Sequence, residues 1–328
     1  MPDRADNGAF LREHAAEIDA AARRIERHVR RTPLLTTDLD RRLRLKPESL
    51  QRTGSFKARG AFNAVLQLRQ RDPGAAGVVT VSSGNHAQAV AAAARSAGLP
   101  AVIVIPFDAD PAKVAATRAQ GAEVIQDGIT FDNREERVRE VMAERGLTLV
   151  HPFDDWDVIH GQGTAAREML EADPEIGTIA TPVGGGGLLS GTALAARARN
   201  PRIRLVGVEP ERADDARRTM RAGRIQRLER APDTIADGVR TTAIGQRNFE
   251  VMVERALIDD MVTVTEAEVQ DTLLRAWLEL KLAIEPTAAL PLAAFLAGKL
   301  PDDGRPIGLI LSGGNASAGV VARLLAAK

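Results

Sequence analysis

Short apolar runs rich in β-branched residues alternate with longer, alanine-rich segments of helical period from about residue 76 onward. Parallel strands must be joined by crossovers, which are usually helices, so this order predicts strand–helix–strand units built on parallel sheets. The first series predicts strands at Val78–Val81, Ala101–Ile105, Glu123–Ile125 and Leu147–Val150, separated by helices near Ala87–Ala97, Pro111–Gln120 and Asn133–Glu144. This block could fold as a unit of its own.

A second series of the same kind follows Pro152. It predicts strands at Thr178–Val183, Arg204–Val208, Met261–Thr265 and Ile307–Leu311, with helices near Gly163–Glu171, after a run of glycines, near Glu266–Leu282 and near Thr287–Ala297. Between them, Arg212–Thr242 is charged and lacks a clear period, which predicts loops with short helices. A chain of 328 residues is too long for one core, so we expect two compact units.

The composition excludes several classes of partner. Forty-four basic residues balance forty-four acidic ones, so no overall field attracts the chain to nucleic acid or to an anionic membrane. Cysteine is absent, which removes disulfides and thiolate metal sites and fits a reducing compartment. Residues 1–30 hold no uninterrupted apolar stretch of the kind found in signal peptides or membrane spans. We therefore expect a cytoplasmic protein without a nucleic-acid or membrane partner.

Four glycine-containing loops carry the residues that suggest chemistry. The first is Gln51–Ala61, in which a turn leads into a helix with Lys57 near its start. A lone lysine is most often a solvated surface charge. Beside an aromatic ring and at the positive end of a helix, however, a lysine amine can be desolvated, so that it acts as a nucleophile or forms a Schiff base.

The second loop, Val81–Gln88, stands between the end of a predicted strand and the start of a helix. One explanation is a simple helix cap. Yet Ser82, Ser83, Asn85 and His86 supply more hydrogen-bonding groups than a single cap requires. Because ligands of open α/β sheets bind at such strand ends, a carboxylate is the expected guest.

The third loop contains the four consecutive glycines Gly184, Gly185, Gly186 and Gly187 between a strand and a helix. A flexible turn would account for one glycine, but four are entropically costly, and their backbone amides at a helix start suit a phosphate group. The sequence matches neither a Walker A loop nor the standard dinucleotide fingerprint. Nicotinamide-dinucleotide binding remains an alternative, because Glu209 ends the next predicted strand where a ribose-binding acid would stand. The fourth loop, Leu311–Asn315, places Ser312 at the end of the last strand, where a simple turn explains it equally well.

In this order, the four loops resemble those of the fold-type II pyridoxal-phosphate enzymes, the tryptophan synthase β-like fold, and most closely their serine/threonine dehydratase and serine racemase branch. The resemblance covers nearly the whole chain, from Arg31-Thr32-Pro33-Leu34 through Glu285-Pro286-Thr287 to Ser-Gly-Gly-Asn. It implies an α/β fold with two open, mostly parallel sheets flanked by helices. It also implies a large cofactor-binding domain at residues 1–76 and 149–328, a small mobile domain at residues 77–148, and a homodimer. Between Leu39 and Lys46 the chain is several residues shorter than the family, which predicts an altered sheet edge there.

The resemblance assigns roles to the loop residues. Lys57 would hold pyridoxal 5′-phosphate through a Schiff base, and Ser312 would meet the ring nitrogen. The remaining cofactor-binding residues would be Phe56, Asn85, Gly184, Gly185, Gly186, Gly187 and Glu285. Ser82, Ser83, Asn85 and His86 would hold the substrate carboxylate, while Arg134 and Thr241 would lie on the substrate side. Glu209, the Ala213 carbonyl and Asp215 would hold Mg²⁺ or Ca²⁺ through hard oxygen ligands.

The implied reaction is the dehydration of L-threonine or L-serine, an ammonia-lyase activity that gives 2-oxobutanoate or pyruvate and ammonia. Ser83 matches the serine that reprotonates Cα in the racemases, so serine racemase with side dehydratase activity is the alternative. Arg134 would equally suit 3-hydroxyaspartate, whose second carboxylate it could pair bidentately. The non-enzyme alternative is a catalytically silent amino-acid-binding homologue.

Overall fold

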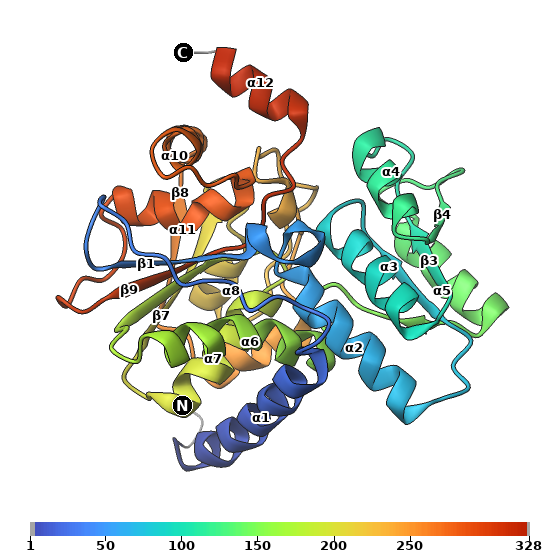
Figure 1. Cartoon of the computed structure of the whole chain (residues 1–328), viewed down its shortest axis with the longest axis horizontal. Helices are drawn as coiled ribbons and strands as arrows, with labels where there is room; N and C mark the ends of the chain where they lie inside the picture. The colour runs from blue at the N-terminus through green and yellow to red at the C-terminus, as the bar shows by residue number, and fades with distance from the viewer. Residues whose placement is uncertain (1–3, 327–328) are drawn as a thin grey trace.

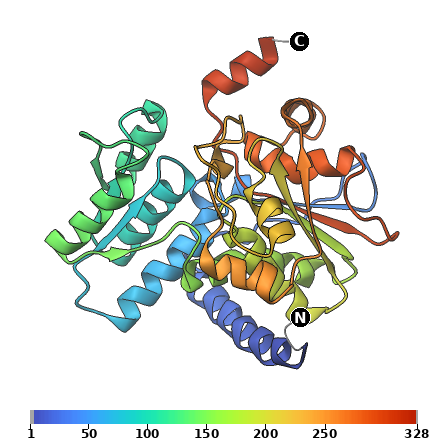
Figure 2. The ribbon, with the colours of Figure 1, turned by 180° about the vertical axis from the view of Figure 1, so that it is seen from behind.

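The computed structural model describes residues 4–326 and contains two parallel sheets with helices packed around them (Figures 1 and 2). One sheet has five strands in the order β1-β9-β6-β7-β8, and the other has four in the order β4-β3-β2-β5. All strand pairs within them are parallel. The predicted α/β class with two open parallel sheets is confirmed.

The five-stranded sheet is buried on both faces. Its strands are β1 (Leu43–Pro47), β6 (Thr178–Pro182), β7 (Arg204–Pro210), β8 (Asp260–Val264) and β9 (Ile307–Leu311). The helices α6 (Trp156–Ala172) and α7 (Gly187–Arg199) share one core with alternate strand residues, and α10 (Glu266–Leu278) and α11 (Pro286–Leu296) share another. In β9, for example, Ile310 belongs to the first core and Leu309 to the second, as the two-residue period of a strand requires.

The four-stranded sheet is smaller. It consists of β2 (Val78–Val81), β3 (Ala101–Val104), β4 (Glu123–Ile125) and β5 (Thr148–Leu149). Helices α2 (Lys57–Arg71), α3 (Asn85–Ala97) and α4 (Pro111–Ala119) pack on one core, and α5 (Arg134–Arg145) on the other. Because α2 precedes the predicted small domain but shares its core, the domain boundaries at residues 77 and 148 stay a prediction.

Some element boundaries differ from the sequence expectations. Helix α6 begins at Trp156, seven residues before the predicted Gly163, because the Asp155 carboxylate accepts hydrogen bonds from the amides of Asp157 and Val158. Helix α10 ends at Leu278 and not at Leu282, and Lys281 has a left-handed φ of 58°. The shortened stretch between Leu39 and Lys46 still yields an edge strand, β1, which pairs with β9.

The remaining helical elements connect the sheets or cover them. Helix α1 (Arg4–Ile25) packs against α6 and α7. The charged segment 212–242 contains the short helices α8 (Asp215–Ala222) and η3 (Asp237–Val239), as expected. The others are η1 (Glu48–Leu50), η2 (Arg52–Gly54), α9 (Gln246–Phe249), η4 (Glu250–Glu254) and α12 (Ala318–Ala326). Within residues 4–326, no helix has the length and apolar character needed to cross a membrane.

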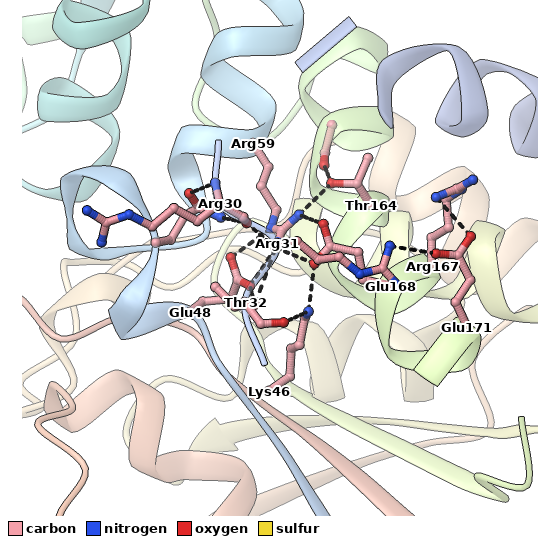
Figure 3. A network of polar contacts seen from close by, with 12 residues as sticks. Arg30, Arg31, Thr32, Lys46, Glu48, Arg59, Thr164, Arg167, Glu168 and Glu171 are labelled. Carbon is pink, nitrogen blue, oxygen red and sulfur yellow. Dashed lines mark hydrogen bonds and ion pairs between the residues drawn. The ribbon is translucent and has the colours of Figure 1, made fainter. Parts of the chain in front are cut away.

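A buried network of charges joins α2, η1, β1 and α6 (Figure 3). The Arg59 guanidinium, fully buried, donates hydrogen bonds to Glu48 at 2.7 and 2.8 Å and to Glu168 at 2.7 and 2.9 Å. Lys46 donates to Glu168 at 2.6 Å and to the carbonyl of Thr32 at 2.7 Å. Two cations thus face two carboxylates, so the network is balanced in charge and fixes the start of α2 against three other elements.

Candidate active site

Three of the four predicted loops contact one another at the carboxyl ends of the strands. The glycine run is linked to them through Phe153, which packs on Gly185 and follows Pro152, the hydrogen-bond acceptor of Lys57. The loop before α2 and the loop after β9 are joined by backbone contacts: the amide of Phe56 donates to the carbonyl of Ser312 at 2.9 Å, and that of Gly314 donates to Gly54 at 2.9 Å. The loop before α3 reaches the same place through Asn85, whose side chain contacts Glu285 and Asn315. Strand ends of parallel sheets thus gather side chains that are far apart in the sequence.

Lys57 is the first residue of α2 and points its amine at the chain segment that precedes α6. Its Nζ donates to the carbonyl oxygen of Pro152 at 2.7 Å and lies 5.1 Å from the centre of the Phe56 ring. Burial of the amine, opposed by the charge of Glu285, lowers the pKa of Lys57 to about 8. In a fraction of the molecules the Lys57 amine is therefore neutral and nucleophilic near neutral pH.

The glycine run leads into α7, whose first residue is Gly187, and its backbone amides are unused. None of the backbone amides of 184–187 donates a hydrogen bond to an acceptor in the described part of the chain. A Cβ added to Gly185 would lie 2.1 Å from Cγ of Phe153, and Gly186 has a left-handed φ of 97°. The glycines are thus required by close packing and backbone conformation, and the free amides at a helix start offer a site for an anion.

Asn85 lies between two side chains that come from the C-terminal part of the sequence. Its Nδ2 donates to both carboxylate oxygens of Glu285, at 2.8 and 3.1 Å, and its Oδ1 accepts from Nδ2 of Asn315 at 2.7 Å. Burial, together with the charge of Asp237, raises the pKa of Glu285 to about 7. The carboxyl group therefore changes its protonation near neutral pH.

Of the other residues in the loop before α3, His86 and Ser82 stabilise the local structure, whereas Ser83 does not. Nε2 of His86 faces the carbonyl of Val150 at 2.9 Å, and burial lowers the pKa of His86 to about 3, so the ring is neutral with its proton on Nε2. The hydroxyl of Ser82 accepts from the amide of Gly84 at 3.2 Å. Ser83 is half-buried and has no hydrogen-bond partner among residues 4–326. Its hydroxyl is thus available to a ligand.

Ser312 is buried at the end of β9, and its Oγ has no partner within the described residues. Such an orphaned hydroxyl costs free energy unless a ligand satisfies it. The Thr241 hydroxyl likewise has no partner among residues 4–326 and lies 3.4 Å from the position that a Cβ on Gly184 would take. Both hydroxyls border the loops described above.

Arg134 begins α5 on the smaller sheet and stacks on Phe131, with 3.3 Å between its guanidinium carbon and the ring centre. Burial lowers the pKa of Arg134, and no carboxylate of residues 4–326 pairs with it. The structure gives Arg134 no direct contact with Lys57 or Ser83. Within the described residues, Arg134 is thus a cation without a carboxylate partner that stacks on one aromatic ring.

The predicted metal ligands lie at the start of α8. The Glu209 carboxylate accepts from the amides of Ala216 and Arg217, both at 2.9 Å, while Oδ2 of Asp215 is buried without a partner in the described chain. Burial raises the pKa of both carboxyls, that of Asp215 to about 7. No group of three or more His, Asp or Glu side chains suited to a metal occurs among residues 4–326. The structure thus shows two buried acids near the start of α8, but it does not bring together a complete set of metal ligands among the described residues.

A family model described as pyridoxal-phosphate dependent enzyme matches residues 25–313. The chain belongs to this family. L-threo-3-hydroxyaspartate ammonia-lyase of Saccharomyces cerevisiae is 42% identical over 313 residues, which are 94% of this chain and 95% of that protein. Among solved structures, a threonine deaminase from T.th. is 47% identical with a TM-score of 0.86, covering 92% of this chain and 98% of its own. Maize serine racemase is 39% identical with a TM-score of 0.89, covering 95% and 97%.

Membership of the pyridoxal-phosphate family confirms the predicted enzyme class and sets aside the nicotinamide alternative and the silent homologue. The residues present fit the cofactor. A desolvated amine at Lys57 suits its aldehyde, the free amides of 184–187 suit its phosphate, and the orphaned Ser312 hydroxyl suits a ring nitrogen. Within the described chain, the Ser312 hydroxyl and the amides of 184–187 have no hydrogen-bond partner, and the Lys57 amine has only a neutral carbonyl as its hydrogen-bond acceptor.

Three residues of the site escaped the sequence analysis. Pro152 contributes its carbonyl to Lys57, Phe153 packs on the glycine run, and Asn315 binds Asn85. Pro152 and Phe153 carry no reactive side-chain group, so their residue types did not indicate a place in the site. Asn315 was within a recognised motif, but its contact across 230 positions could not be read from spacing.

Proposed function

We propose that this protein is a pyridoxal-phosphate-dependent ammonia-lyase that dehydrates L-threonine and L-serine to 2-oxobutanoate or pyruvate and ammonia. The observation that carries the proposal is the desolvated amine of Lys57 among loops that offer an anion site and an unpaired neutral hydroxyl. The identity to ammonia-lyases and to a threonine deaminase over nearly the whole chain supports this reaction.

Different residues of the site would have different roles in the reaction. Pyridoxal phosphate, when bound, supplies an electron sink for the negative charge that develops at Cα of the substrate. The unused amides at the start of α3, with Ser83, would bind the substrate carboxylate. The amine of Lys57, once free, would remove the Cα proton because its lowered pKa leaves it partly neutral.

Ser312 would limit the electron-withdrawing strength of the cofactor ring. A serine hydroxyl cannot force a proton onto a ring nitrogen as a carboxylate does, and Ser312 is buried at the end of β9 with no acid bonded to it within the described residues. A moderate sink favours loss of the β-hydroxyl over transamination. The elimination product then takes up water and releases ammonia and the 2-oxo acid.

The test is a substrate panel on protein reconstituted with pyridoxal phosphate. L-threonine, L-serine, D-serine and the 3-hydroxyaspartate stereoisomers are scored for oxo acid and for inverted amino acid. We expect oxo acid from L-threonine or L-serine, and borohydride reduction should fix the cofactor on Lys57. A colourless protein that stays inactive with added cofactor would refute the proposal.

Racemisation is a second candidate, favoured by the free hydroxyl of Ser83. An acid on the substrate face opposite Lys57 could return a proton to Cα with inversion. Ser83→Ala is therefore expected to abolish inversion of serine and to keep most elimination from the L-substrate. Equal loss of both activities would remove Ser83 from this role.

Arg134 favours extension of the substrate class to 3-hydroxyaspartate. Its guanidinium is not paired within residues 4–326, and a second substrate carboxylate would satisfy it bidentately. Arg134→Met should then lower kcat/KM for 3-hydroxyaspartate much more than for L-serine. A uniform change for both substrates would argue against this contact.

We also propose that Glu209, the Ala213 carbonyl and Asp215 hold Mg²⁺ or Ca²⁺ for stability. The buried Oδ2 of Asp215, which has no hydrogen-bond partner in the described part of the chain, supports this. MgCl₂ or CaCl₂ should raise the melting temperature of the wild type but not that of Asp215→Asn. A homodimer, the small mobile domain at residues 77–148 and a cytoplasmic location likewise remain proposals that rest on the family resemblance.

A further inference from the structure

The side chain of Asn315 connects three loops of the site. Its Nδ2 donates to the carbonyl oxygen of Thr53 at 2.7 Å and to Oδ1 of Asn85 at 2.7 Å. Thr53 belongs to the loop that leads to Lys57, and Asn85 starts α3. One amide group thus links the lysine loop to the loop that faces Glu285.

These contacts fix the direction of each amide. The carbonyl of Thr53 can only accept a hydrogen bond, so the atom of Asn315 that faces it must be Nδ2. The same Nδ2 faces Asn85, which must therefore present Oδ1 on that side. It follows that Nδ2 of Asn85 faces Glu285, where the two contacts of 2.8 and 3.1 Å are found. The amide of Asn85 thus presents its donor side to Glu285 and its acceptor side to Asn315.

The turn held by Asn315 is conformationally strained. Thr53 has a left-handed φ of 58°, which is unfavourable for a β-branched residue, and Gly54 follows with φ 72°. A Cβ on Gly54 would lie 2.3 Å from Oδ1 of Asn315, so the glycine makes room for this side chain. Two independent features of the lysine loop are therefore matched to the position of Asn315.

We propose that Asn315 is a positioning residue that orients the Asn85 amide toward the cofactor and holds the Thr53–Gly54 turn ahead of Lys57. The inference rests on the proposed function, because it assumes that the cofactor binds beside Asn85. Without the amide of Asn315, Asn85 could rotate and present an oxygen where a donor is needed, leaving both Glu285 and the cofactor poorly paired.

The test compares three proteins reconstituted with pyridoxal phosphate: wild type, Asn315→Ala and the matched control Asn63→Ala. Asn63 also donates from Nδ2 to a backbone carbonyl, that of Asp157 at 2.7 Å, but lies further along α2. The dissociation constant of the cofactor, its absorption maximum and the pH midpoint of that absorption are measured. Asn315→Ala should weaken cofactor binding roughly tenfold, as expected for a lost buried hydrogen bond, and shift the spectrum. Asn63→Ala should lower the melting temperature and leave binding and spectrum unchanged.

A double mutant shows whether Asn315 acts through Asn85. In the background of Asn85→Ala, the further change Asn315→Ala should weaken cofactor binding by a smaller factor than it does in the wild type, because the contact with Asn85 is already gone and only the contact with Thr53 is left to lose. Equal factors in the two backgrounds would show that Asn315 does not act through Asn85. Asn315→Asp retains the shape but places an acceptor against Thr53 and Asn85, so it should give a spectral shift even where Asn315→Ala does not fold.

The outcomes distinguish failure of the proposed function from failure of the role of Asn315. Wild-type protein that binds no cofactor overturns this inference together with the proposed function. Wild-type protein that binds cofactor, with Asn315→Ala and Asn315→Asp unaltered in spectrum and affinity, overturns the role of Asn315 alone. Equal weakening by Asn63→Ala would show that the effect is general destabilisation, which also overturns it.

Discussion

The amine of Lys57 lies 2.7 Å from the carbonyl oxygen of Pro152 and has no ion-pair partner within residues 4–326. Burial removes water from the charged amine and lowers the pKa of Lys57 to about 8 from its ordinary 10.5, and the charge of Glu285 offsets this only in part. The unfolded chain holds this proton more tightly than the native one. The charged amine therefore destabilises the cofactor-free fold below about pH 8, and this penalty fades between about pH 8 and 10.5.

Lys57→Met should accordingly stabilise the cofactor-free protein at pH 7 by about 1–2 kcal/mol, with little gain left at pH 10. Urea unfolding at the two pH values measures this. Lys281→Met, at an exposed position, controls for the loss of a surface lysine. A gain that is equal at both pH values would show that burial of the charge is not its cause.

Glu285 should make the cofactor-free protein less stable as the pH rises. The pKa of Glu285 is raised to about 7 from 4.5, so the native state binds this proton more tightly than the unfolded chain. Its stabilising effect is present below about pH 4.5 and is lost as the pH rises through about 7. Glu285→Gln should gain about 2 kcal/mol on the wild type between pH 5 and 8. Parallel stability–pH curves for the two proteins would contradict the assignment.

The buried charge network predicts a large effect at Arg59. Removing the guanidinium in Arg59→Met leaves Glu48 and Glu168 with only Lys46 to neutralise them (Figure 3). We expect a loss of about 3–5 kcal/mol in the free energy of unfolding, because an unpaired buried charge remains. Arg137→Met, which breaks the surface pair with Glu140, should cost less than about 1 kcal/mol. Similar losses at the two sites would refute the argument from burial.

Gly185→Ala should damage the anion site directly. The added Cβ would lie 2.1 Å from Cγ of Phe153, so the ring or the loop must move. We expect at least about a tenfold weaker affinity for pyridoxal phosphate, measured by absorbance titration, with partial recovery in Gly185→Ala/Phe153→Ala. Gly8→Ala, whose Cβ would meet only the end of the Arg12 side chain at 3.4 Å, should leave the affinity unchanged. Unaltered binding in Gly185→Ala would exclude the loop as the phosphate site.

Much of the fold followed from local sequence pattern. The strands at Val78–Val81 and Ile307–Leu311 were predicted with the bounds that the structure has, because short apolar runs between turn residues have a distinct period. The start of α6 was placed too late, since the signal lay in the cap at Asp155 and not in the apolar period. Capping is a single hydrogen-bonding event, which composition over a window does not reveal.

The sequence by itself determined which loops carry chemistry, because Lys57, the glycines 184–187 and Ser312 each stand at a strand or helix end, where local pattern places them. Only the tertiary structure decided how those loops meet. Pro152 opposite Lys57, Phe153 against Gly185, and Asn315 between Thr53 and Asn85 are contacts between distant segments. Their geometry depends on the packing of two sheets and on the direction of single amide groups, which local sequence does not encode.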